Sequence, residues 1–214
     1  MRFHLVLSVA LMAVVAPCMA ATVKLQVTDQ AGKPLADAVA TLTPDAPDAA
    51  SAKALPPRDH FIDQKEETFV PLVEIVTVGD QVIFRNSDRT RHHVYTFSPL
   101  GSFEFVLKPN EVSTPVRLQK AGVIPVGCNI HDFMINYLFV TDSRWAGKSD
   151  AQGALALTDV PPGSYTVKWW HPRQRPGGAP VTQVLTVSGE QFSATQALSV
   201  MAPPPRDDTE RERY

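Results

Sequence analysis

The sequence predicts an all-β chain made of antiparallel sandwiches. Nineteen prolines among 214 residues leave few uninterrupted windows for a helix, and no helix-period apolar pattern of any length stands out. Short apolar runs instead alternate with polar residues, and turn signals containing Gly, Pro or Asp separate them. Many short strands at regular spacing are typical of sandwich folds, which is the basis of this prediction.

Residues 1–20, MRFHLVLSVALMAVVAPCMA, predict a secretory signal peptide. Arg2 provides a positive start, an apolar run follows, and small residues precede a cleavage position after Ala20. The run is too short for a stable membrane span, and no second hydrophobic span follows it. An alternative is a lipoprotein acylated at Cys18, although Pro17 stands where such signals carry Gly, Ala or Ser. We therefore expect a soluble periplasmic chain.

Charge and length limit the classes of partner and the number of domains. The formal net charge is −2 and no basic stripe is present, so nucleic acid is not an expected partner. After cleavage about 190 residues remain, which is room for one large or two small domains.

Residues 21–44 predict two strands with a hairpin-like connection. Apolar and polar residues alternate from Val23 to Val27, a Gly-Lys-Pro turn follows, and a second apolar run contains Leu42. Residues 45–61 are rich in Ala, Pro and Asp without periodicity and predict a linker.

Residues 62–142 predict a dense run of strands that form one domain. A Gly79-Asp80 turn separates its first apolar stretches, and four further stretches follow, HHVYTFSP, FEFVLKP, GVIPVGC and INYLFVTD. Residues 143–200 predict further strands, with turn signals such as DAQG and PPG between them. Residues 201–214 cannot bury a core and predict a disordered tail.

Cys128 is the one cysteine that remains after signal cleavage. An unpaired thiol in an oxidising compartment must be buried or bound, so it is a core thiol, a nucleophile or a metal ligand. Its neighbours favour the metal, because the stretch GCNIHDFM spaces Cys128, His131 and Met134 as Cys-x2-His-x2-Met. A nucleophile would need an orienting acid, and Asp132 is poorly placed for that role.

A second imidazole comes from the stretch RHHV, upstream of the cysteine. Strand alternation favours His92 over His93, because His92 then points inward with Val94. Two imidazoles, a thiolate and a weak thioether form the blue-copper ligand set, whereas a thioether is an unusual partner for zinc. The sequence thus predicts one copper ion per chain, and these four ligands: His92, Cys128, His131 and Met134.

The segment from about residue 69 to residue 140 resembles a cupredoxin, and its ligand loop has the amicyanin length. The resemblance implies a Greek-key sandwich and a type 1 copper site, and it carries the same four ligands over. His93 stands where the family has Asn, and Ile130 and Asp132 stand where prolines often flank the loop histidine. The combined sequence also resembles proteins labelled as methylamine-utilisation proteins, which implies a dehydrogenase and a cytochrome as redox partners.

The pieces on either side of the cupredoxin-like segment are similar to the two halves of a carboxypeptidase-regulatory-like, or prealbumin-like, β-sandwich. The stretches QAGKPLADAVATL and DAQGALALTDVPPGSYTVKWWHP carry this resemblance. It implies that the cupredoxin-like domain is joined to this sandwich or inserted in it. Trp169, Trp170 and His171 then form either a docking surface or, as we expect, an aromatic core with a strand end.

Taken together, the sequence predicts an electron carrier and not an enzyme, because four protein ligands leave no room for a substrate. We expect outer-sphere transfer through an exposed edge of His131. The alternatives are a copper storage or delivery protein, and a structural module with a vestigial site. His60 and His171 have no partner motif and are expected to be structural or exposed, and Asn86 and Asp88 are expected to form a turn.

Overall fold

The computed structural model describes residues 20–46 and 56–203 of the chain. All of the regular secondary structure in these residues is β-strand, so the all-β prediction is confirmed. None of the described segments forms a helix that could cross a membrane. The predicted signal peptide lies almost wholly outside the described residues, as do most of the predicted tail and the middle of the predicted linker.

The central sandwich comprises residues 59–141 and packs two sheets face to face. One sheet has the order β5-β11-β10-β7-β8, and the other has the order β4-β3-β6-β9. The strands are β3 (Asp59–Gln64), β4 (Phe69–Val70), β5 (Val73–Thr77), β6 (Gln81–Asn86), β7 (His92–Ser98), β8 (Gly101–Leu107), β9 (Val116–Arg117), β10 (Gly122–Cys128) and β11 (Ile135–Thr141). Inward-facing residues of both sheets form one apolar core, which includes Phe84, Val94, Val126 and Leu138.

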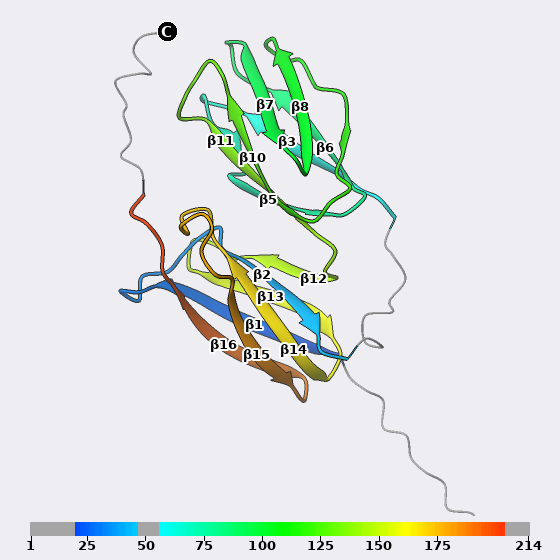
Figure 1. The fold of residues 1–214 in the computed structure, drawn as a ribbon, viewed down its shortest axis with the longest axis vertical. Coiled ribbons are helices and arrows are strands. Elements are labelled where there is room, and N and C mark those ends of the chain that lie inside the picture. The colour runs from blue at the N-terminus through cyan, green and yellow to red at the C-terminus, as the bar shows by residue number, and fades with distance from the viewer. Residues whose placement is uncertain (1–19, 47–55, 204–214) are drawn as a thin grey trace, which may run out of the picture.

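The flanking sandwich is built from the chain on both sides of the central one, with sheets ordered β13-β1-β16 and β12-β2-β14-β15. Its strands are β1 (Ala21–Asp29), β2 (Val39–Pro44), β12 (Trp145–Lys148), β13 (Ala154–Val160), β14 (Gly163–Trp170), β15 (Val181–Val187) and β16 (Gln191–Leu198). Figure 1 shows the cyan and green strands of the central sandwich above the blue, yellow and orange strands of the flanking one. The central sandwich therefore interrupts the flanking one between β2 and β12.

The expected hairpin between β1 and β2 is wrong. A tight turn does reverse the chain, since Asp29 N–H donates to Lys33 O at 2.8 Å and Thr28 bridges Pro34. However, β1 pairs with β13 and β16, whereas β2 pairs with β12 and β14 in the opposite sheet. The reason is packing, because Leu25 and Leu42 both belong to the core between the sheets and each strand must cover the other's apolar face.

The two sandwiches meet at Trp170. Its ring centroid lies 5.6 Å from that of Tyr137 and 5.5 Å from that of Phe139, both on the outer face of β11. Trp169, in contrast, lies in the core of the flanking sandwich. His171 is also buried, with Nε2 3.1 Å from Ala36 O. The three residues therefore do not form one exposed docking surface.

Candidate metal centre

The ends of three strands bring the predicted ligands together. His92 is the first residue of β7, Cys128 is the last residue of β10, and the two strands are paired so that Cys128 lies opposite Val94. Six residues then lead to β11, and this loop folds back on itself. Cys128 N–H donates to Met134 O at 3.3 Å, and Met134 N–H donates to His131 O at 3.1 Å.

His92, Cys128 and His131 converge on one point. The two Nδ1 atoms lie 3.2 Å apart, and Cys128 Sγ lies 3.8 Å from His92 Nδ1 and 3.6 Å from His131 Nδ1. An ion about 2.0–2.1 Å from each nitrogen and about 2.3 Å from the sulfur would see these atoms at angles of roughly 100–120°. The three donors thus fit a metal in trigonal or distorted tetrahedral geometry. They form the one such cluster of His, Cys, Asp and Glu found in the described part of the chain.

Met134 is joined to this cluster through the backbone, because its carbonyl oxygen accepts the Cys128 N–H. Its side chain is buried, and it belongs to the same apolar core as Cys128. A buried thioether next to a thiolate can act as a weak fourth ligand for a soft metal. His93 is placed differently. It faces outward, with Nε2 2.6 Å from Glu104 Oε1 and Nδ1 3.4 Å from Asn129 Nδ2, so strand alternation separates it from the donors.

Asp88 fixes the ring of His92, a role that the sequence analysis did not assign. Asp88 Oδ2 lies 2.9 Å from His92 Nε2. When Nδ1 faces a metal, Nε2 carries the proton and its N–H donates a hydrogen bond to this carboxylate. The hydrogen bond sets both the tautomer and the orientation of the ring. Asn86 holds the loop in place, since its Oδ1 accepts from Asp88 N–H at 2.9 Å. The only sequence signal for this contact was an acidic residue four positions before His92, and that spacing is not specific to such a contact.

The electrostatics of the cluster favour a thiolate. Burial raises the pKa of Cys128, but hydrogen bonds from His92, from backbone N–H groups and from His131 outweigh burial and bring the pKa down to about 6. Burial likewise lowers the pKa of His92, yet hydrogen bonds to Cys128 and Asp88 leave it raised. At neutral pH the sulfur is therefore available in the form that binds soft metals.

His131 is buried, so the expectation that its edge is exposed is wrong. Only 3% of the residue is accessible. The tight turn between β3 and β4 covers it, and Glu67 Oε1 lies 4.0 Å from His131 Nε2. Glu66 and Glu67 both have φ of 52°, as in a type I′ turn, where Asn-Gly is the usual pair. The Asp88 carboxylate compensates by accepting both amides, from Glu66 N–H at 2.6 Å and from Glu67 N–H at 2.9 Å.

His60 is more than an isolated histidine. Its Nδ1 lies 2.7 Å from Glu74 Oε1 and its Nε2 lies 2.9 Å from Asp80 Oδ2. The hydrogen bond to Glu74, and also the one to Asp80, raise its pKa against the opposing effect of burial. The residue thereby ties β3 to β5 and to the turn that follows β5.

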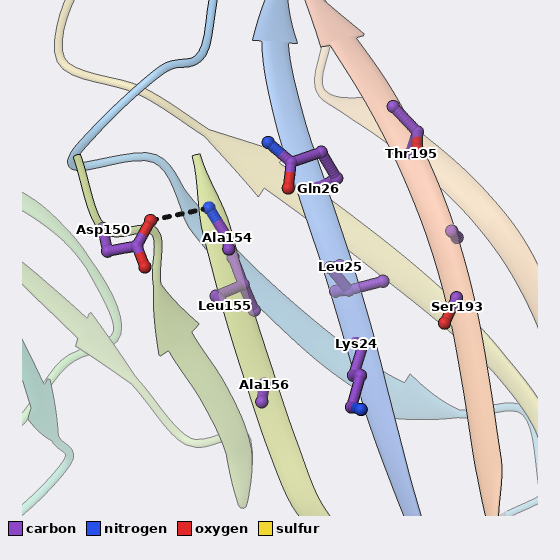
Figure 2. Close-up of a pocket in the computed structure, with 10 residues that line it drawn as sticks. Lys24, Leu25, Gln26, Asp150, Ala154, Leu155, Ala156, Ser193 and Thr195 are labelled. Carbon is purple, nitrogen blue, oxygen red and sulfur yellow. Dashed lines mark hydrogen bonds between the residues drawn. The ribbon is translucent and has the colours of Figure 1, made fainter. Parts of the chain in front are cut away.

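The outer face of the sheet β13-β1-β16 carries a shallow groove of about 690 Å³. Figure 2 shows Lys24 and Gln26 on its floor, between small side chains of β13 and β16. Gln26 Nε2 donates to Gln152 O at 2.7 Å, and Lys24 Nζ lies 3.4 Å from Gln191 Oε1. None of the three clustered donors lines this groove, so the metal centre is separate from it.

Comparison with known proteins gives structural similarity alone. No protein-family model and no curated protein matches the chain. A Cu(I) form of a mutant amicyanin is similar at 20% identity over 48% of this chain and 98% of that chain, with a TM-score of 0.36. A copper-containing nitrite reductase from Thermus scotoductus is similar at 27% identity over 46% of this chain and 25% of that chain, with a TM-score of 0.35. A purple cupredoxin from Nitrosopumilus maritimus is similar at 18% identity, over 38% of this chain and 98% of that chain, with a TM-score of 0.34. Because these TM-scores are low, what the site can do is inferred from its own atoms.

Proposed function

We propose that this chain is a copper-binding electron carrier that cycles one ion between Cu(II) and Cu(I). The proposed ligands are His92 Nδ1, Cys128 Sγ, His131 Nδ1 and, as a weak fourth ligand, Met134 Sδ. The observation that carries the proposal is the buried trio of two imidazole nitrogens and one thiol within 3.8 Å of one another. This donor set, with a neighbouring thioether, suits copper better than zinc.

Burial of the donors supports electron transfer in place of substrate chemistry. His92 and Cys128 are fixed by paired strands, and Asp88 fixes the His92 ring from behind. A site held in this way changes little when the ion changes oxidation state, which favours rapid outer-sphere transfer. Four protein ligands leave no coordination position for a substrate, so the proposed role involves no chemical conversion.

The cellular setting belongs to the same proposal. We place the mature chain in the periplasm because residues 1–20 predict a signal peptide. A dehydrogenase and a cytochrome are the candidate redox partners, because the sequence resembles methylamine-utilisation proteins. The flanking sandwich is proposed to be of the carboxypeptidase-regulatory-like type. Its contact with the central sandwich through Trp170 supports a role in holding or presenting the copper unit.

One observation favours a second candidate function, copper storage. The turn at Glu66 and Glu67 covers His131, and burial of both imidazoles would slow the exchange of a bound ion. A storage protein would hold Cu(I) without a reversible potential, whereas a carrier gives a reversible potential and a strong thiolate-to-Cu(II) colour. Voltammetry of the copper-loaded protein distinguishes the two.

The deciding experiment is metal analysis with a visible spectrum of the protein expressed in a periplasm. We expect one copper per chain and intense colour. Cys128→Ser should abolish the colour, because a serine hydroxyl is not a soft ligand. The matched control is His93→Ala, which removes an imidazole from the outer face and should leave the colour unchanged. A copper-free parent protein, or a Cys128→Ser variant with the parent's colour, would refute the proposal.

A further inference from the structure

Strand β15 is an open edge of the flanking sandwich. It ends the sheet β12-β2-β14-β15, and among the described strands it pairs with β14 alone, in unbroken register. Every second residue of an edge strand turns its N–H and C=O away from the sheet, where another strand can pair with them. Proteins usually prevent such pairing with a charge, a proline, a bulge or a very short strand. The seven residues of β15, VTQVLTV, include no charged residue and no proline.

The other edges of the flanking sandwich are protected or polar. β12 has four residues, and the Nζ of its Lys148 donates to Val73 O in the central sandwich at 2.7 Å. β13 carries a bulge, since its register with β1 shifts between Ala21 and Val23 and Asp159 has a φ of 57°. The fully exposed side chains of β16 are polar or small. β15 is therefore the edge of this sandwich that is most open to a further strand.

The sequence of β15 reads almost the same in both directions around Val184, whose side chain is 68% exposed at the middle of the strand. Suppose that a second β15 lies antiparallel, with the two Val184 residues opposite each other. Thr182 then faces Thr186 of the second copy, and Val181 faces its Val187. Thr–Thr pairs and pairs of β-branched side chains stabilise antiparallel sheets. The strand is thus complementary to itself.

Gln183 provides an independent observation. Its Oε1 is buried, and it has no hydrogen-bond partner in the described part of the chain. A buried acceptor without a donor is costly and is rare in folded proteins. In the same antiparallel register, Gln183 of one copy lies diagonally across from Gln183 of the other, on one face of the sheet and within reach of a long side chain. Each side-chain amide can then donate to the Oε1 of the other.

The charges beside β15 also fit a second copy of the chain. Lys168 lies opposite Thr182, near the start of the strand. Asp45 accepts a hydrogen bond from the hydroxyl of Ser164, which lies opposite Thr186 near the end of the strand. Antiparallel pairing brings the basic end of one copy towards the acidic end of the other. The two surfaces are therefore electrostatically complementary.

The central sandwich leaves room for this pairing. It contacts the flanking sandwich at Trp170, directly after Trp169, which lies opposite the first residue of β15. Because the two copies of β15 run in opposite directions, the first residue of each lies beside the last residue of the other. The two central sandwiches therefore lie at opposite ends of the pair.

We propose that β15 is a dimerisation edge, and that its occupant is the β15 of a second copy of this chain, paired antiparallel about a two-fold axis at Val184. The sheet β12-β2-β14-β15 then continues across the axis into the same sheet of the second copy. The two open edges close on each other and the far edges end in β12, so association stops at the dimer. The inference goes beyond the proposed electron-carrier function and does not depend on copper.

The first test is sedimentation of the copper-free mature chain between about 1 μM and about 1 mM, the range in which small interfaces associate. A reducing agent keeps Cys128 from linking two chains. We expect a reversible doubling of mass with concentration. Val184→Lys and Val184→Glu should each abolish the dimer, because like charges then meet on the axis. The matched control is Val106→Lys, at a valine that is 57% exposed on the edge strand β8, and it should dimerise like the parent.

The second test is an equimolar mixture of Val184→Lys and Val184→Glu. Opposite charges then meet across the axis, so the mixture should form a heterodimer although neither variant dimerises alone. Amide hydrogen exchange of residues 181–187 should be slower in this mixture and in the concentrated parent than in either variant alone, because paired amides are protected.

Three results would overturn the proposal. A parent chain that stays monomeric at the highest concentration would show that β15 does not pair with itself. A dimer that survives Val184→Lys, or that Val106→Lys dissociates, would place the interface on another surface. A mixture that stays monomeric would show that position 184 does not face its own copy.

Discussion

Asp88→Asn tests whether the carboxylate behind His92 shapes the metal centre. Three N–H groups face the Asp88 carboxylate as hydrogen-bond donors. Oδ1 accepts from Glu66 N–H at 2.6 Å, and Oδ2 accepts from Glu67 N–H at 2.9 Å and faces His92 Nε2 at 2.9 Å. An asparagine has one oxygen and one NH2 group in these two places. In either orientation of the side-chain amide, its NH2 group faces at least one of the N–H groups that the carboxylate accepted.

The expected magnitude follows from that count. With its oxygen toward Glu67 N–H and His92, the asparagine leaves only the exposed Glu66 N–H without its acceptor, which costs about 1 kcal/mol in the free energy of unfolding of the copper-free protein. Loss of a carboxylate behind a ligating imidazole typically lowers metal affinity about 10–100-fold, because the ring is less basic and less well oriented. We therefore expect both quantities to fall in Asp88→Asn.

The assays are urea unfolding of the copper-free protein and chelator competition for copper. Asp150→Asn is the matched control. Asp150 Oδ1 also accepts two backbone amides in a turn, from Gln152 N–H and Ala154 N–H at 2.9 Å, but no histidine of the described residues hydrogen-bonds to it. The control should leave copper affinity unchanged. If Asp88→Asn binds copper as tightly as the parent and the control do, Asp88 does not orient His92.

Two further predictions concern Met134 and His60. Met134→Gln should lower the reduction potential and leave a coloured protein, because a harder axial donor stabilises Cu(II) relative to Cu(I); complete loss of copper would show that the thioether is needed for binding. The raised pKa of His60, caused first by Glu74 and then by Asp80, means that the protonated ring stabilises the fold below its ordinary pKa and that this contribution is lost as pH rises through the raised value. His60→Gln should therefore cost about 1 kcal/mol at about pH 5.5 and less at about pH 8.5, measured by urea unfolding, and an equal cost at both pH values would contradict the assignment.

The sequence predicted those features that depend on local pattern. Alternation in β7 placed His92 inward and His93 outward, because Val94 has to face the core. The pairing of β1 and β2 could not be predicted in the same way. The partners of β1 are β13 and β16, near the other end of the chain, and no local pattern indicates which of several apolar strands pair.

The cover over His131 could not be predicted from local pattern either. Glu66 and Glu67 are unusual residues for a type I′ turn, and the turn forms with a carboxylate that is supplied from a different loop. Asp88 looked like an ordinary turn residue, because Asx residues commonly form turns. Its real partners are distant in sequence or four residues away, and only the folded chain brings them together.

Asp88 makes the covering turn and the metal ligand a single structural unit. The same carboxylate that holds Glu66 and Glu67 in their left-handed conformation also faces the imidazole of His92. A change that opens the turn must therefore also loosen that ring, and it would uncover His131 at the same time. The turn thus closes the imidazole side of the donor cluster and keeps the His92 ring in place, so that both the cover and the rigidity of the site depend on one carboxylate.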